Sequence, residues 1–272
     1  MRTASYDAVA AIPTRVGELS LLIGNAQKVE RTDEALYNAL CRACSVLMAS
    51  QLEGFVKDLC KGIIGDFNFN VVSFKDRPVA IQREFCRRIA FFEGVEAKEI
   101  DKRVNLLMTY FGRNSVPIEM HAFSYMESNN KNPGPDVIDN ALAKLGVPDA
   151  IASISGGFFE DVFQNDSRIN YRVKRECVRA RSLLFSFPYT CAPEFYGLRY
   201  RASRTGGPTM WHDYLDGVLR RRHTIAHGDT VENVTTWEEL ERDADKLFVF
   251  MHAVAFSAGN FFGKMISQTA GR

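Results

Sequence analysis

The sequence predicts an all-α protein. Apolar residues recur every three or four positions over most of the 272 residues, and few stretches alternate like strands for more than four residues. Residues typical of helix N-termini, such as Thr32-Asp33 and Thr235-Thr236, precede the longest periodic stretches. The 46% hydrophobic content is ordinary for a folded protein, so the chain can bury a core without help. We expect one domain over residues 1–272.

The N-terminal half contains four expected helices and one loop. The second helix has an N-cap signal at Thr32-Asp33, an apolar stripe, and two glycines, Gly62 and Gly65, at its expected end. Residues 66–75 are rich in Asn and Phe without helical period, so they are expected to form a loop. The expected helices cover residues 9–28, 34–64, 79–92 and 97–111.

The C-terminal half has more breaks. The Pro- and Asn-rich cluster at residues 129–135 is the strongest break and predicts a loop. A long aromatic and basic connector spans residues 187–208. Pro208 or Thr209 opens a helix that stops at Gly228, and Thr235 or Thr236 with Glu239 gives capping-box spacing for the last helix. The expected helices cover residues 136–145, a short stretch from 148, 160–185 with irregular spacing, 209–228 and 236–265.

The charge of the chain is unevenly distributed. The formal net charge is only +1, so no global field draws the protein to nucleic acid. Between Asn165 and Arg222, however, twelve basic and five acidic residues leave a net charge of +7, against −6 for the rest. A local basic surface is therefore expected.

Cysteines and apolar runs predict a cytoplasmic protein without membrane spans. The six cysteines lie mostly in apolar helical patterns, and the first residues lack the apolar core of a signal peptide. Cys41 and Cys44 have no second pair nearby, so we interpret them as buried thiols rather than as zinc ligands. The apolar run 247–256 is too short for a membrane span of about 20 residues. No cofactor or metal is expected.

The segment 219–228 carries the strongest chemical signal. It reads Leu-Arg-Arg-Arg-His-Thr-Ile-Ala-His-Gly, and it places His223 and His227 on one helical face, with Arg222 about 140° around but long enough to reach. Arginine offers phosphate a permanently charged planar fork, and histidine is the side chain that ordinarily titrates near neutrality. A metal-free ribonuclease needs this pair. The alternatives are a cationic helix end that favours the helix dipole, and half a zinc site, which lacks the glutamate of a metalloprotease.

These residues resemble the R-x4-H motif of the HEPN superfamily, with Arg222, a polar His223, then His227 and Gly228. More loosely, residues 49–58 resemble the first core helix of bacterial HEPN-like proteins, and Asn132-Pro133 with Leu145-Gly146 resembles the middle of that group. The resemblance implies a HEPN-like antiparallel helical bundle, here with additional helices and a long connector.

The resemblance also implies a function, a metal-independent endoribonuclease. The ribose 2′-OH would attack the adjacent phosphorus, with His227 as general base or acid, Arg222 stabilising the phosphoryl charge and His223 positioning the phosphate. One motif per chain implies a homodimer. The expected setting is a toxin or phage-defence effector held by an antitoxin or other defence partner. The rivals are a non-catalytic RNA- or nucleotide-binding module and a helical scaffold.

Other residues are candidates for supporting the motif or for binding RNA. Glu53 either holds a motif arginine or faces water, and Asp229 either orients His227 or caps the helix. Connector aromatics such as Tyr189 and Tyr196 either stack on bases or pack on the core. A stripe on one helix face either follows a phosphate backbone or is simply solvated. The candidate RNA-binding residues are Arg168, Arg172, Arg175, Arg179, Arg220 and Arg221.

Overall fold

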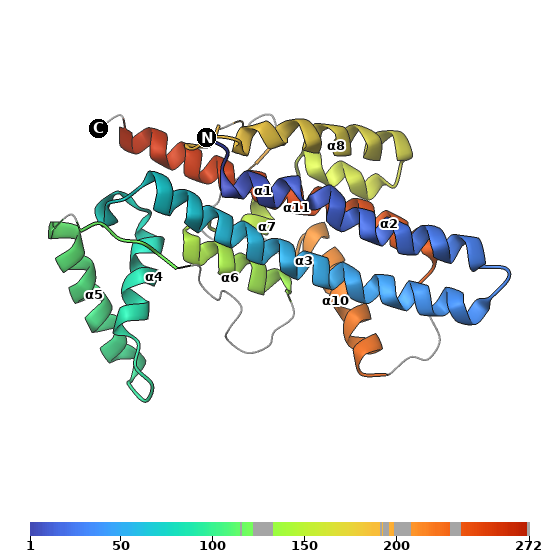
Figure 1. Cartoon of the computed structure of the whole chain (residues 1–272), viewed down its shortest axis with the longest axis horizontal. Helices are drawn as coiled ribbons and strands as arrows, with labels where there is room; N and C mark the ends of the chain where they lie inside the picture. The colour runs from blue at the N-terminus through green and yellow to red at the C-terminus, as the bar shows by residue number, and fades with distance from the viewer. Residues whose placement is uncertain are drawn as a thin grey trace.

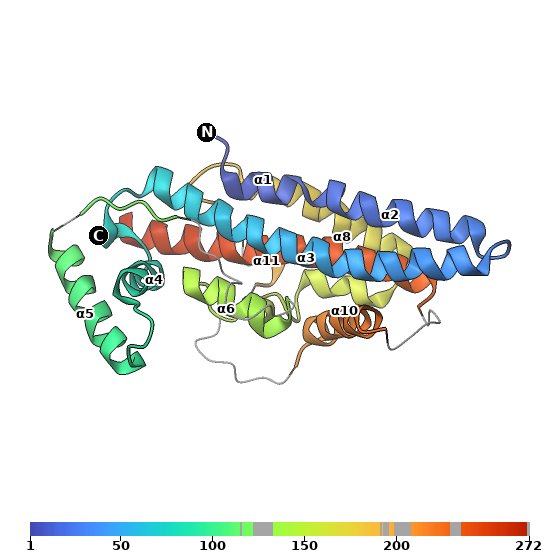
Figure 2. The ribbon, with the colours of Figure 1, turned by 60° about the horizontal axis from the view of Figure 1, so that its bottom comes forward.

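Two long helices, α3 (Glu34–Asn70) and α11 (Trp237–Ala270), run along the centre of the molecule (Figures 1 and 2). The computed structural model describes residues 1–114, 116–121, 133–190, 192, 196–198, 208–228 and 235–270. For residues 267–270 it describes the backbone alone. Within these ranges every regular element is a helix, apart from a single isolated bridge between Ser73 and Pro117. The predicted all-α fold class is therefore confirmed.

Shorter helices surround the central pair. α2 runs alongside α3 and also packs on α11, whereas α8 packs on α11 and α10 packs on α3. α4 and α5 form a hairpin that projects from one end of the bundle (Figures 1 and 2). The surrounding elements are α1 (Ala4–Ala10), α2 (Ile12–Val29), η1 (Phe74–Asp76), α4 (Val79–Ala90), α5 (Ala97–Asn114), α6 (Pro135–Leu145), α7 (Ala150–Ser153), η2 (Phe158–Gln164), α8 (Ser167–Ala180), η3 (Arg181–Leu184) and α10 (Met210–Ala226).

Local capping signals predicted several helix starts correctly. The Asp33 carboxylate accepts the Leu36 N–H at 2.9 Å and caps α3. The Thr236 N–H donates to the Glu239 carboxylate at 3.2 Å, and the Glu239 N–H donates to the Thr236 hydroxyl at 3.4 Å, which is the expected capping box of α11. Side chains of this kind satisfy N–H groups that a helix start leaves without partners.

The predicted end of α3 near Ile64 was wrong, because the helix continues through both glycines to Asn70. A Cβ atom on Gly62 would stand 2.9 Å from the backbone of Ala4 and Ser5, so this glycine lets α1 approach closely. One turn on, the Asp66 carboxylate accepts the N–H groups of Ala4 and Ser5 at 2.7 and 3.0 Å. Packing of α1 thus stabilises turns that the local sequence does not favour.

Two predicted helices are interrupted. The helix predicted over residues 9–28 corresponds to α2, whereas Val9 and Ala10 at its predicted start belong to a separate helix, α1, which ends before Ala11. The stretch 160–185 consists of η2, α8 and η3, because Asn165 adopts a left-handed backbone conformation with φ 55°. Asp166 then caps α8 by accepting the N–H groups of Arg168 and Ile169.

A continuous hydrophobic core joins the helices. In α11, nearly every side chain from Leu247 to Ala258 is buried, as expected for a helix surrounded on all sides. No helix in the described part of the chain is both long and apolar enough to cross a membrane.

Candidate functional site

The helix α10 has a buried first half and an exposed end. The Thr209 hydroxyl accepts the His212 N–H and caps the helix, and Trp211, Tyr214, Leu215 and Val218 form its buried face. The last turn differs: His223, Ala226, His227 and Gly228 are exposed. The helix ends at Ala226, and Gly228 has a φ of 73°, the left-handed conformation in which glycine commonly stops a helix. The sequence thus correctly placed the motif at a helix end.

The two motif histidines lie against one another. Their ring centroids are 4.2 Å apart with an angle of 50° between the ring planes. The backbone N–H of His227 donates to the backbone carbonyl of His223 at 3.0 Å. Arg222 is half-buried and already interacts with a neighbouring group. The predicted convergence of His223 and His227 on one face is therefore present, beside an arginine.

Two other histidines have structural roles. The His212 Nδ1 lies 2.8 Å from the Thr209 hydroxyl and completes the cap of α10. His252 is fully buried in α11 and accepts a hydrogen bond from Arg181. His223 and His227 are exposed instead, so their rings can reach a ligand in solution.

The three arginines before the motif differ in their surroundings. Arg220 is exposed, and its carbonyl accepts the Thr224 hydroxyl at 3.0 Å. Arg221 forms an ion pair with Asp243 of α11, whose side chain is only 11% exposed. Helix C-termini carry partial negative charge, which repels phosphate, and this cluster of cations offsets that effect. The sequence did not identify Asp243, because nothing in a local pattern shows which face of α11 meets α10.

For Glu53 the structure favours the surface alternative. Its carboxylate pairs with Lys57 one turn later, at 2.7 Å. Glu53 is five residues beyond Met48, whose sulfur meets the Tyr214 hydroxyl of α10, and so projects about 140° around α3 from that contact. Asp229, the other supporting candidate, lies outside the described residues.

The arginine stripe of α8 is exposed, and most of it is paired. Arg172 forms an ion pair with Asp161 at 2.8 Å, and Arg175 and Arg179 both approach Glu176, at 3.7 and 2.7 Å. Arg168 is exposed at the start of the helix. The opposite face of α8, with Val173 and Cys177, packs on the core. These arginines share the outer face, as predicted.

The stripe and the motif do not meet. In Figure 1, α8 lies along the upper edge of the molecule and α10 at the lower edge, with α2, α3 and α11 between them. α8 packs on α11 and η2, whereas α10 packs on α3 and α6. An RNA that touched both would have to pass around the bundle.

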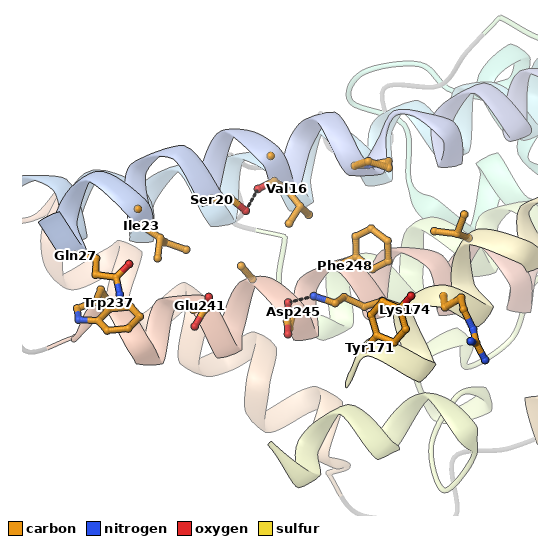
Figure 3. Close-up of a pocket in the computed structure, with 16 residues that line it drawn as sticks. Val16, Ser20, Ile23, Gln27, Tyr171, Lys174, Trp237, Glu241, Asp245 and Phe248 are labelled. Carbon is orange, nitrogen blue, oxygen red and sulfur yellow. Dashed lines mark hydrogen bonds and ion pairs between the residues drawn. The ribbon is translucent and has the colours of Figure 1, made fainter. Parts of the chain in front are cut away.

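A groove of about 620 Å³ lies between α2, α8 and α11 (Figure 3). Its walls combine apolar side chains such as Phe248 with an ion pair in which the Lys174 Nζ lies 2.6 Å from the Asp245 Oδ1. Arg175 of the stripe contributes to one end. No residue of α10 lines this groove, so it is separate from the motif.

Two connector aromatics are fixed to the core rather than available for stacking on bases. The Tyr189 hydroxyl donates to the Asp66 carboxylate at 2.7 Å, and Tyr196 stacks on Phe159 and Phe256. The other aromatic and basic residues of the connector, Phe195, Arg199, Tyr200, Arg201 and Arg204, lie outside the described residues.

The prediction of buried thiols at Cys41 and Cys44 is confirmed. Both are buried and free, and burial raises the pKa of Cys44 to about 12. Among the described residues, His, Cys, Asp and Glu form no group of three or more that could hold a metal ion.

Comparison with known proteins identifies one family. A family model described as RiboL-PSP-HEPN matches residues 12–255, from the start of α2 through the motif to just past the midpoint of α11. Separate comparisons with the curated proteins and with the solved structures find no match.

Proposed function

Because the chain belongs to the RiboL-PSP-HEPN family of the HEPN superfamily, we propose that it is a metal-independent endoribonuclease of toxin or phage-defence type. The observation that carries the proposal is the contact between His223 and His227 beside Arg222 at an exposed helix end. A site that cleaves RNA without a metal ion needs a proton-transfer group and a cation for the phosphate.

In the proposed reaction, the ribose 2′-OH attacks the adjacent phosphorus and the bond to the 5′ oxygen breaks. His227 removes the 2′ proton or protonates the departing oxygen, since one imidazole cannot do both at once. Arg222 stabilises the charge that develops on the phosphoryl oxygens, and His223 holds the phosphate. The products are a 2′,3′-cyclic phosphate and a 5′-OH, and DNA is not cut because it lacks the attacking group.

A homodimer supplies the second proton-transfer group in this proposal. Among the described residues, no side chain donates to or accepts a hydrogen bond from either motif imidazole, although a catalytic base is ordinarily oriented by a third group. A two-fold axis near the end of α10 would bring two copies of the motif into one cleft. The same observation also favours the second candidate, a HEPN-like module that binds RNA or nucleotide without cleaving it.

An active ribonuclease in the cytoplasm needs restraint, so we propose an antitoxin or another defence-system protein as its partner. The reducing compartment is supported by the five free cysteines among the described residues.

The test is cleavage of RNA by the purified full chain in EDTA, with end analysis of the products. We expect His227→Ala to lower the cleavage rate by about 10² to 10⁴-fold, the contribution of acid–base catalysis. Arg222→Ala should lower it by about 10² to 10³-fold through the loss of charge stabilisation. The exposed Thr190→Ala variant provides a control away from α10. Binding without cleavage by the wild type would select the second candidate, and wild-type rates in both variants would refute the assignment.

A further inference from the structure

α11 presents two aspartates to opposite sides of the bundle. Asp243 and Asp245 are two residues apart, which separates them by about 200° around the helix. Asp245 faces α8, where it pairs with Lys174 (Figure 3). Asp243 faces α10 and pairs with Arg221, which directly precedes Arg222.

Asp243 connects to α10 at two levels. Its carboxylate forms an ion pair with the Arg221 guanidinium, and its backbone carbonyl accepts a hydrogen bond from the hydroxyl of the buried Tyr214 at 2.7 Å. Tyr214 and Arg221 are seven residues apart, so Asp243 contacts α10 at two points that lie about two turns apart along the helix axis. Two such points fix both the position of the helix and its rotation.

The Arg221 contact is well placed to determine the direction of the motif. Arg221 is two residues before His223 and six before His227. Both histidines are exposed, whereas the residues between them and Arg221 are half-buried or exposed. Lys246 also binds the Asp243 carboxylate, at 3.2 Å, so the buried carboxylate has two cationic partners. Charged hydrogen bonds in a water-poor site are stronger and more directional than surface ones.

We propose that Asp243 is a positioning residue for the α10 motif, acting through Arg221 to set where Arg222, His223 and His227 project. In this proposal Arg221 supports the motif through its ion pair with Asp243 and does not itself bind RNA phosphate. The inference rests on the proposed function only where cleavage is the readout; the orientation of the histidines can be measured without it.

The first experiment records the imidazole C–H signals of the full chain by NMR in Asp243→Asn, Arg221→Gln and Asp245→Asn. We expect the signals of His223 and His227, assigned with single His→Gln variants, to move in the first two proteins. Asp245→Asn is the matched control, because it removes an aspartate of the same helix that faces α8, and it should leave them in place. Unmoved signals in both Asp243→Asn and Arg221→Gln would overturn the proposal, whatever the activity.

The second experiment measures cleavage kinetics on the same proteins. Misplacement of reacting groups lowers kcat, and we expect a fall of about tenfold or more with KM changed less than about threefold. Asp243→Glu should restore part of kcat. If Arg221→Gln instead weakened RNA binding and its salt dependence with kcat intact, Arg221 would be a phosphate contact and the proposal would be wrong.

Folding is a separate outcome of this test. Arg221→Gln leaves Asp243 paired with Lys246, so it should fold even if Asp243→Asn does not. Unfolding of Arg221→Gln, judged by circular dichroism, would show that the pair holds the fold rather than the motif, and would also overturn the proposal. A wild type that cleaves no RNA while the histidine signals still move would refute the proposed function and leave the positioning role standing.

Discussion

His252 is expected to make the protein less stable in mild acid. Its ring is fully buried, and both nitrogens are committed: Nε2 lies 3.1 Å from the Arg181 Nε–H, and Nδ1 lies 2.7 Å from the Phe248 carbonyl. Since Arg181 can only donate, Nε2 must accept, and the ring hydrogen must be on Nδ1. A second proton would face an arginine inside the core. Burial is the main cause that lowers the pKa of His252 to about 3; the Arg181 charge acts in the same direction, and the hydrogen bond to the Phe248 carbonyl acts against it.

The size of the effect follows from proton linkage. In the unfolded chain His252 binds a proton below its ordinary pKa of about 6.5, whereas in the folded chain it stays neutral down to about 3. A histidine with a lowered folded pKa contributes stability that is present above the unfolded pKa and lost as the pH falls. The slope is about 1.4 kcal/mol per pH unit, so the loss between pH 7 and pH 5 is about 2 kcal/mol.

His252→Gln isolates this contribution. The glutamine carbonyl can still accept from Arg181, but it does not titrate. Urea unfolding followed by circular dichroism at pH 7 and pH 5 gives four free energies of unfolding. We expect the variant to lose about 2 kcal/mol less than the wild type between the two pH values, although it is less stable overall at pH 7. Carboxylates titrate equally in both proteins and cancel. Equal acid losses would show that His252 is not the source of the effect.

Two further predictions concern RNA binding and assembly. The double variant Arg172→Ala/Arg175→Ala should weaken binding of a non-cleavable RNA and reduce the slope of log affinity against log salt concentration by up to about two units, with cleavage at saturating RNA unchanged. Arg87→Ala/Arg88→Ala in α4 is the charge-matched control. Equal effects of the two double variants would show that the α8 stripe is only a solvated surface. We also expect a homodimer with Arg222 near its two-fold axis, and sedimentation equilibrium measures whether the dimer forms. A monomer that still cleaves RNA would refute the composite site.

Local signals predicted helices well and their lengths less well. Caps at Asp33, Thr209 and Thr236 depend on side chains within three residues of the helix start, so the sequence contains all the necessary information. The extension of α3 past Gly62 depends on α1 lying against it, a contact between segments about sixty residues apart. No window of the sequence reveals such a contact.

The candidate site shows the same division. The shared face of His223 and His227 follows from helical spacing alone, and Gly228 marked the end of the helix correctly. The pairing of Arg221 with Asp243, and the separation of the α8 stripe from the motif, depend on how helices are rotated and placed in the bundle. Three adjacent arginines look equivalent in the sequence, and only packing distinguishes the paired Arg221 from the exposed Arg220.

The contrast between the buried first half of α10 and its exposed last turn has an evolutionary consequence. Substitutions at Trp211 or Leu215 remove core contacts and are selected against through folding. Substitutions at His223 or His227 disturb little packing, so drift can erase the chemistry of the last turn while the bundle persists. We therefore expect lineages of this family to contain descendants with an intact fold and an altered motif.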